Sequence, residues 1–424
     1  MTNPLNTYDA ETRRHFVERC AKTALGLTIL PAAPMLAEDT QPNTHPGFGR
    51  AKRVIVLQLN GGMSHIDTFD PKSGPSKGPG DAIKTSADFQ VTEFLPKTAA
   101  IANKICVLRT MTAEVGVHKP AQYVIRTGYT SRGTVRHPNI GAWAQHYLGR
   151  SHKTMPSSVC VNRRSDQGNG FFPSSYAPLA IGKPDDGLSN IKALGNKKEL
   201  SDRLSLLDSL DTGFRSQFND KRVQAYNGYY EDAVALMSSR DLDAFDIGKE
   251  TQAVRELYGD STLGQGCLLA RRLVSTGVRF VEVAHDGWDM HKNLTDDMTD
   301  LAPVFDQAYA ALITDLDRLG MLDSTLVVVA TEFGRKPEFS GDGRSHHPLC
   351  FSTLLAGGGI KRGYVHGESD SHGKHVKENP IHIGNFHATI GCAAGMPIHK
   401  PVVSPDGRPF TVGDKKQPIH EVFA

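Results

Sequence analysis

Residues 323–335 read Asp323-Ser-Thr-Leu-Val-Val-Val-Ala-Thr-Glu-Phe-Gly-Arg335. A turn leads into a run of mostly β-branched apolar residues, which is typical of a strand buried on both faces of a parallel sheet. Glu332 follows at the strand's carboxyl end, where open α/β sheets bind their ligands. Because an unpaired buried carboxylate is costly, Glu332 must be metal-bound, hydrated or ion-paired, with Arg335 or Arg344 as candidate partners.

Similar apolar runs recur along the chain and alternate with helical patterns. In residues 263–275 and 301–319, apolar residues recur at three- and four-residue steps, as on one face of a helix. This alternation predicts an α/β fold with a doubly wound, mostly parallel sheet and helices on both faces. The predicted strands are residues 53–60, 104–109, 157–161, 278–284, 325–330 and 350–355.

Charge and cysteine content exclude some functional classes. Lys and Arg total 48 against 46 Asp and Glu, a formal net charge of +2, so nothing indicates nucleic acid or an anionic membrane surface as a partner. The cysteines are scattered with no Cys-x-x-Cys pair, which excludes a zinc ribbon or a thioredoxin-like motif. Buried free thiols are the simpler interpretation, and one disulfide stays open as the alternative.

The first 50 residues differ in composition from the rest. Arg13-Arg14 precedes a short apolar stretch at residues 24–31, and small residues follow up to Ala37. This order predicts a twin-arginine export signal at residues 1–37 and a polar linker at 38–50; an amphipathic first helix is the alternative. The apolar stretch is too short to span a bilayer. We therefore expect export to the periplasm or cell surface, with no integral membrane segment in the mature protein.

Residues 51–424 are expected to form one domain that carries a helical insertion. Residues 196–260 interrupt the alternation of strands and helices, and the polar stretch up to Tyr258 has helical character. We interpret this region as an insertion rather than a second catalytic domain. Its clearest amphipathic pattern is Leu200, Leu204, Leu207 and Leu210.

A carboxylate and an imidazole follow the predicted strand at residues 278–284. Asp289 and His291 stand two residues apart, so both side chains can turn into one site. Asp and His are ordinary ligands for zinc, manganese or iron. A surface loop with an Asp–His hydrogen bond is the alternative.

A histidine pair occupies the polar loop predicted at residues 343–348. Adjacent side chains point in different directions, so at most one of His346 and His347 is expected to bind a metal directly. Such a pair alone is more often a solvated surface feature. Its occurrence together with Glu332 and the Asp289–His291 pair, each near a strand end, predicts a metal site.

Residues 118–127 are predicted to form a helix, with Pro120 in the first turn and Gly128 as the stop. His118 would face the positive end of the helix dipole, a favourable place for an anionic substrate. A helix that merely begins near a histidine is the alternative.

Gly61-Gly62, after the first predicted strand, resembles a phosphate-cradling turn. No Gly-x-Gly-x-x-Gly or Lys-Ser/Thr pattern follows, so nucleotide binding has little support. Ser64, His65 and Asp67 lie too close together in the sequence to form a hydrolase triad.

Five stretches are specific enough to carry a family resemblance, among them Gly287-Trp-Asp-Met-His-Lys-Asn293 and Thr331-Glu-Phe-Gly-Arg335. The others are residues 59–71, 343–348 and 366–373. On these stretches the chain resembles the bacterial family called domain of unknown function 1501 (DUF1501), itself similar to sulfatases and the wider alkaline phosphatase superfamily. The resemblance covers residues 52–423 and implies an alkaline phosphatase-like fold.

The similarity to sulfatases implies a role for His118. Sulfatases carry Cys-x-Pro-Ser-Arg and then Thr-Gly, with the cysteine modified into the nucleophile; here the same spacing gives His118-Lys-Pro-Ala-Gln and then Thr127-Gly128. His118 is therefore expected to accept a phosphoryl group, to transfer a proton or to bind a metal. Arg335 or Arg344 is expected to hold the anion bidentately.

The same similarity implies an altered metal site. Asn60 stands where sulfatases end their first strand in paired aspartates, and Phe333 stands where a second ligand would follow the Glu332 carboxylate. What remains implies one divalent metal, and the sequence leaves zinc, manganese, calcium and magnesium open. The expected ligands are Asp289, His291, Glu332, Asn60 and one of His346 and His347.

Taken together, the sequence predicts an exported, metal-dependent hydrolase of sulfate or phosphate esters, with extracellular glycans among its substrates. The expected partner is an anionic ester or glycan. The alternative is a non-catalytic secreted binding or scaffold protein that kept the fold and lost the chemistry.

Overall fold

The computed structural model describes residues 47–163, 168–188 and 233–424, with a few residues between 198 and 209. Residues 45–424 cluster into one compact unit. The predicted export signal and most of the predicted linker lie outside the described residues, and so does much of the predicted insertion.

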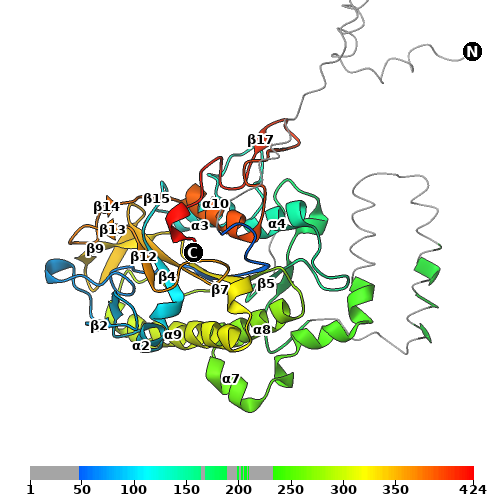
Figure 1. Ribbon diagram of the computed structural model, residues 1–424, viewed down its shortest axis with the longest axis horizontal. Helices are drawn as coiled ribbons and strands as arrows, with labels where there is room; N and C mark the ends of the chain where they lie inside the picture. The colour runs from blue at the N-terminus through cyan, green and yellow to red at the C-terminus, as the bar shows by residue number, and fades with distance from the viewer. Residues whose placement is uncertain are drawn as a thin grey trace, which may run out of the picture. The chain divides into compact units, whose positions relative to one another are not determined.

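Within the described residues, a nine-stranded sheet forms the centre of this unit (Figure 1). The strand order is β12-β4-β11-β8-β1-β7-β5-β6, and β15 pairs with β4. All pairs are parallel except those that β11 makes with β4 and β8, so the predicted mostly parallel sheet is confirmed. The strands are β1 (Arg53–Leu59), β4 (Ile105–Thr112), β5 (Ser158–Val161), β6 (Leu179–Ile181), β7 (Phe280–His285), β8 (Thr325–Ala330), β11 (Phe351–Ala356), β12 (Tyr364–His366) and β15 (Ile381–His382).

The three central strands end at the same edge of the sheet. Leu59 of β1 pairs with His285 of β7, and Gln58 pairs with Ala330 of β8. Because these pairs are parallel, the loops that follow β1, β7 and β8 leave the sheet side by side.

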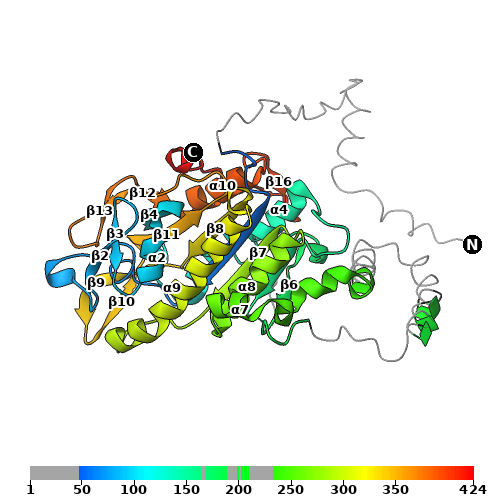
Figure 2. The ribbon, with the colours of Figure 1, turned by 60° about the horizontal axis from the view of Figure 1, so that its bottom comes forward.

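Helices cover both faces of the sheet, as the two views show (Figures 1 and 2). The alternation of side chains along β1 divides the core: Ile55 and Leu57 join one hydrophobic cluster, while Val54 and Val56 join the other. Among the described residues, no helix is both long and apolar enough to cross a bilayer. The first cluster includes residues of α2 (Pro96–Ala100), α7 (Gln252–Tyr258), α8 (Thr262–Ser275) and α9 (Leu294–Arg318), and the second includes residues of α3 (His118–Thr127), α4 (Ile140–Leu148) and α10 (Ile383–Ala394).

Two predicted helices are present with informative boundaries. Helix α3 spans the predicted residues 118–127 and ends at Gly128, whose φ of 78° is the left-handed conformation that favours glycine. Helix α9 begins seven residues before the predicted 301, because the loop after β7 leads directly into it at Leu294. The described part of the predicted insertion, residues 233–260, contains α7 and the 3-10 helices Arg240–Phe245 and Ile247–Lys249.

The prediction of a polar loop at residues 343–348 is wrong. These residues form strand β10 (Gly343–His347), which pairs antiparallel with β9 (Gly334–Ser340). The hairpin was missed because its strands are polar and lack the apolar alternation that marks a half-buried strand. The remaining short strands are β2 (Ala82–Lys84), β3 (Gln90–Thr92), β13 (Glu368–Ser369), β14 (Val376–Glu378), β16 (Val402–Val403) and β17 (Pro409–Phe410).

The cysteines in the described part of the chain are free and buried. Burial raises the pKa of the Cys106 thiol and that of the Cys350 thiol to about 12. Both are therefore protonated, packed side chains rather than nucleophiles.

Candidate metal centre

Four side chains from three separate segments meet beside the carboxyl ends of the central strands. Each offers one nitrogen or oxygen atom, and these atoms all lie within 4.8 Å of one another. One segment is the start of α3, one is the loop after β7 and one is the β9–β10 hairpin. The four residues are His118, Asp289, His291 and His346.

The loop after β7 supplies two of the four residues, because its side chains are alternately buried and exposed. Trp288 and Met290 are buried, whereas the side chains of Asp289 and His291 are 47% and 46% exposed. The two apolar residues hold the loop in the core, and so the two polar residues face outward into one site. This is the arrangement that the two-residue spacing predicted.

Two glycines let the segments approach one another. A Cβ atom on Gly61, whose φ is 117°, would lie 2.5 Å from the backbone nitrogen of Asp289. A Cβ atom on Gly343 would lie 2.2 Å from the carbonyl carbon of His291. Any larger residue at either position would push the loop away from the turn after β1 or from the hairpin.

His118 is oriented by Glu332. Glu332 Oε1 lies 2.8 Å from His118 Nδ1 and also accepts a hydrogen bond from Gly61 N at 2.9 Å. A carboxylate accepts and does not donate, so Nδ1 of His118 donates to Glu332 and Nε2 lies on the other side of the ring. That Nε2 atom is buried, has no hydrogen-bond partner, and lies 3.1 Å from Asp289 Oδ2.

His346 is oriented in the same way. Its Nδ1 lies 2.8 Å from the carbonyl oxygen of Gly116 and donates to it. The lone pair on Nε2 therefore faces His291 Nε2 at 2.8 Å and Asp289 Oδ1 at 3.3 Å. Two imidazole lone pairs thus converge on a carboxylate, which is favourable only when a cation or a shared proton lies between them.

Arg335 fixes the charge of Asp289. Burial alone would raise the pKa of Asp289, but the Arg335 guanidinium, 2.5 Å from Oδ1, outweighs it together with His118 and His346, and the pKa falls to about 2. Asp289 is therefore a carboxylate at any physiological pH.

The donor set fits a single transition-metal ion. A tetrahedral zinc ion with bonds of about 2.0 Å places its ligand atoms roughly 3.3 Å apart. The four contacts within the cluster, three to Asp289 and one between His291 and His346, measure 2.8 to 3.3 Å. The unpartnered Nε2 of His118 completes the set, and all four ligand atoms lie within 4.8 Å of one another, so the donor types and their spacing suit a metal.

The sequence matches a family profile over residues 51–423, whose description is "Protein of unknown function (DUF1501)". The chain belongs to the DUF1501 family. No curated protein matches it.

Several solved structures are similar to this DUF1501 chain at low identity. The PsFucS1 sulfatase from Pseudoalteromonas sp. is 11% identical, with 83% of this chain and 69% of that chain covered and a TM-score of 0.41. The phosphonate monoester hydrolase SpPMH from Silicibacter pomeroyi is 12% identical (82% and 74% covered, TM-score 0.35), and the alkaline phosphatase from the Antarctic bacterium TAB5 is 13% identical (73% and 92% covered, TM-score 0.33). Likenesses this distant carry no argument about this chain, so the chemistry of the centre is argued from its own residues.

The two arginines expected to hold the substrate anion already have partners within the DUF1501 chain, and Arg335 contacts Asp289 of the cluster. Both guanidinium groups are fully buried. Arg335 donates to Asp289 and to the carbonyl oxygens of Gly61, Gly62, Trp288 and Arg344. Arg344 forms two hydrogen bonds with Asp67, at 2.8 and 3.2 Å, and its other donors go to the carbonyl oxygens of Ser76, Lys336 and Pro337. Both guanidinium groups therefore hold separate segments of the chain together.

Three predicted ligands also stand outside the four-residue cluster. His347 points to the opposite side of β10 from His346, and its Nε2 is 2.6 Å from the carbonyl oxygen of Lys374. Asn60 donates to Asp286 Oδ1 at 2.8 Å instead of facing the cluster. Glu332 touches the cluster only through His118, as the partner that orients a ligand.

Phe333 has a role that the sequence did not indicate. Its ring lies 5.0 Å from the ring of His118 and 4.5 Å from that of His346, so it packs against both imidazoles. The sequence showed Phe333 only as the loss of a ligand. The Gly116 carbonyl that orients His346 left no signal in the sequence, because any residue supplies a carbonyl.

Proposed function

We propose that this protein is an exported, metal-dependent hydrolase of sulfate or phosphate esters. One observation carries the proposal: His118 and His346 each place Nδ1 2.8 Å from an oxygen acceptor and direct Nε2 toward a carboxylate oxygen of Asp289, at 3.1 and 3.3 Å. A structural histidine directs a ring nitrogen at a backbone carbonyl, as His347 does with that of Lys374. These two are instead arranged as ligands are, with the outer nitrogen held and the inner one presented.

The metal we propose is zinc or another transition metal. Three imidazole nitrogens and one carboxylate oxygen suit zinc, manganese or iron. Calcium and magnesium prefer all-oxygen sites. Of the four metals that the sequence left open, zinc fits this donor set best.

The proposed roles of the residues follow from their contacts. A bound metal would polarise the ester and stabilise the negative charge that develops on its oxygens. His118, Asp289, His291 and His346 would hold the ion, and Glu332 would keep His118 in the tautomer that binds it. Lys119, exposed and adjacent to His118, would attract the anionic ester toward the centre. In this proposal His118 acts as a ligand rather than as the nucleophile.

A non-catalytic binding or scaffold protein is the second candidate. The observation that favours it is the burial of Arg335 and Arg344, which removes the two expected anion clamps from the site. Such a protein would bind anionic glycans without turnover, whether or not it holds a metal.

Metal analysis of the purified protein, followed by turnover assays, tests the proposal. We expect about one zinc, manganese or iron per chain and hydrolysis of an aryl sulfate, a phosphomonoester or a phosphodiester. His291→Ala should lose both, and His399→Ala, an exposed histidine outside the cluster, should lose neither. Metal without any turnover would favour the second candidate, and protein free of metal after export would contradict both the centre and the hydrolase.

Export has a separate test. Replacing the arginine pair by lysines (Arg13→Lys with Arg14→Lys) should leave the protein in the cytoplasm, because the twin-arginine pathway recognises the pair. Cell fractionation with an antibody measures this. Unchanged recovery in the periplasm would contradict the proposed signal.

A further inference from the structure

Three aromatic rings from separate segments pack together at the metal centre. Phe333 follows β8, His118 begins α3 and His346 lies on β10. The ring centroid of Phe333 lies 5.0 Å from that of His118 and 4.5 Å from that of His346, and the two imidazole centroids are 4.3 Å apart. At these separations each ring contacts the other two. We call these three residues the ring trio.

The ring of Phe333 also packs against the turn after β1. Its side chain is fully buried. A Cβ atom on Gly62, whose φ is 78°, would lie 2.6 Å from Cε2 of Phe333, so only glycine allows this close approach. The turn is itself held, because Arg335 Nε donates to the carbonyl oxygen of Gly62 at 2.9 Å. Phe333 is therefore confined between a fixed turn and the two imidazoles.

Hydrogen bonds alone leave the planes of the two imidazoles adjustable. Glu332 Oε1 lies 2.8 Å from His118 Nδ1, and the carbonyl oxygen of Gly116 lies 2.8 Å from Nδ1 of His346. A hydrogen bond accepts a broad range of directions at such an oxygen, and the torsion that turns a histidine ring has broad minima. Each imidazole can therefore tilt about its one held nitrogen. Contact with the ring of Phe333 restricts this tilt in both.

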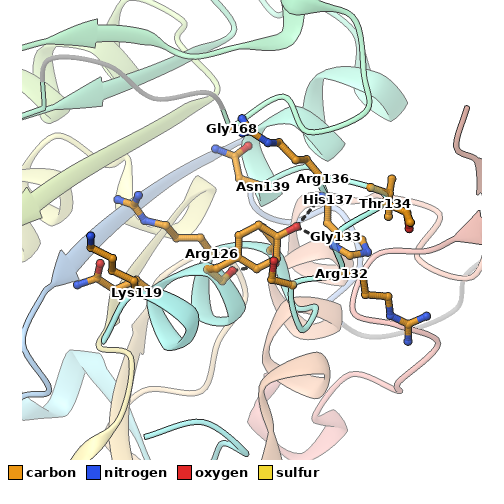
Figure 3. Close-up of a pocket in the computed structure, with 14 residues that line it drawn as sticks. Lys119, Arg126, Arg132, Gly133, Thr134, Arg136, His137, Asn139 and Gly168 are labelled. Atoms are coloured by element: carbon orange, nitrogen blue, oxygen red, sulfur yellow. Dashed lines mark hydrogen bonds between the residues drawn. The ribbon is translucent and has the colours of Figure 1, made fainter. Parts of the chain in front are cut away.

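Helix α3 does not enclose His118 from every side. Lys119 and Gln122, in the first turns of the helix, line a pocket of about 760 Å³ that also borders the loop between α3 and α4 (Figure 3). None of the four residues of the metal centre lines this pocket. The start of α3 thus has open space beside it. The orientation of the His118 ring depends on its contacts with Glu332 and Phe333.

We propose that Phe333 is a positioning residue of the metal centre, which fixes the planes of His118 and His346 before a metal binds and thereby selects zinc over manganese. This inference rests on the metal centre of the proposed function and not on ester hydrolysis. Ligands that are already in place lose less freedom on binding. Zinc takes four ligands in a tetrahedron, whereas manganese suits carboxylate, carbonyl and water oxygens. The buried ring of Phe333 fills space that additional water ligands would need.

Chelator competition with zinc and with manganese, on purified protein freed of metal, tests this role without measuring turnover. The Phe333→Leu variant keeps an apolar side chain but loses the flat ring. Its zinc affinity should fall about tenfold, as for other residues that orient ligands, while its manganese affinity stays the same. The preference for zinc should therefore fall about tenfold as well.

The matched control is Phe280→Leu. Phe280 is a buried phenylalanine at the start of β7, the end of the strand away from the loop that carries Asp289 and His291. This variant should unfold at a lower urea concentration than the wild type, because it also loses buried apolar volume. Its affinities for zinc and manganese should be unchanged.

A second measurement needs no variant. In the metal-free wild type, nitrogen-15 relaxation of the histidine rings should show restricted motion for His118 and His346. The ring of His399, which is exposed and outside the centre, should move freely. This comparison decides the proposal even when Phe333→Leu does not fold.

Each outcome counts for or against the proposal. A lower zinc affinity and a lower zinc preference in Phe333→Leu, both absent from Phe280→Leu, support it. An unchanged zinc preference, an equal loss in both variants, or freely moving rings of His118 and His346 in the metal-free wild type overturn it. A wild type that binds neither metal overturns it together with the metal centre. If zinc binds as expected but no ester is hydrolysed, the hydrolase proposal fails while the role of Phe333 stands.

Discussion

Two adjacent histidines of β10 end in opposite environments. His346 points to the cluster, where its Nε2 faces another imidazole and a carboxylate, and its side chain is 23% exposed. His347 points inward, where its Nε2 binds the Lys374 carbonyl and its ring stacks on that of His65. One residue along a strand reverses the side of the sheet on which a side chain lies. Residue type alone therefore does not identify a ligand.

The two environments differ in how polar atoms are satisfied. The interior pair uses peptide carbonyls: His65 Nε2 lies 2.7 Å from the Gly373 carbonyl, as His347 does from that of Lys374. In the cluster, His118 Nε2 lies 3.1 Å from a carboxylate oxygen of Asp289, and His346 Nε2 lies 2.8 Å from His291 Nε2. His65 Nδ1 is nevertheless buried without a hydrogen-bond partner, so an unpartnered imidazole nitrogen alone does not mark a ligand. In the proposed function, a cation would complete the cluster.

Replacing His346 or His347 by alanine should give the largest difference between the two environments. His346→Ala should weaken metal binding by more than about 100-fold, because even partners of ligands cost 10–100-fold, and should cost about 1 kcal/mol of stability or less. His347→Ala should keep the metal but lose about 2 kcal/mol, since it empties a buried, hydrogen-bonded position. Chelator competition and urea unfolding measure the two effects. Equal loss of metal affinity in both variants would contradict the assignment of His346, and not His347, as a ligand.

The Glu332→Gln variant tests whether Glu332 orients His118 for metal binding. The amide keeps the size of the side chain but weakens the acceptor for His118 Nδ1, so metal affinity should fall about 10- to 100-fold. The matched control is Asp286→Asn, which changes a carboxylate that binds Asn60 outside the cluster. Competition with a chelator gives both affinities. An unchanged affinity in Glu332→Gln would remove Glu332 from the centre.

Acidification should lower the stability of the fold through the buried side chain of His65. Burial lowers the pKa of His65 to about 4, against 6.5 for the free side chain. Between these values the unfolded chain binds a proton that the folded chain does not, so stability is complete above pH 6.5 and falls below it. From pH 6.5 to 5.5 this costs about 1 kcal/mol.

Urea unfolding at the two pH values checks this figure. His65→Gln should flatten the decrease by about that amount, and His399→Gln, an exposed histidine, should not. A decrease that persists unchanged in His65→Gln would mean that His65 is not buried in its neutral form.

The sequence predicted the parts of the molecule that depend on local pattern. Runs of β-branched residues located the central strands, and the spacing of Asp289 and His291 placed both on one side of their loop. The helix pattern placed His118 at a helix start, and only the family resemblance implied that it could bind a metal. The choice between His346 and His347 stayed open because it depends on the hairpin, whose polar strands carry no periodic signal.

Long-range contacts could not be predicted in this way. Arg335 and Arg344 were assigned to a substrate because an arginine beside a predicted site suits an anion. In the structure they satisfy backbone carbonyls and carboxylates from distant segments. Which carbonyls a fold leaves without a donor is a property of its three-dimensional path, and no single residue records it.

The most direct test is anomalous X-ray scattering from crystals of protein purified without added metal. The account predicts one peak, within about 2.0–2.2 Å of Nε2 of His118, of one nitrogen each of His291 and His346, and of the Asp289 carboxylate. No peak, or a peak bound by Asn60 and Asp286 instead, would contradict it.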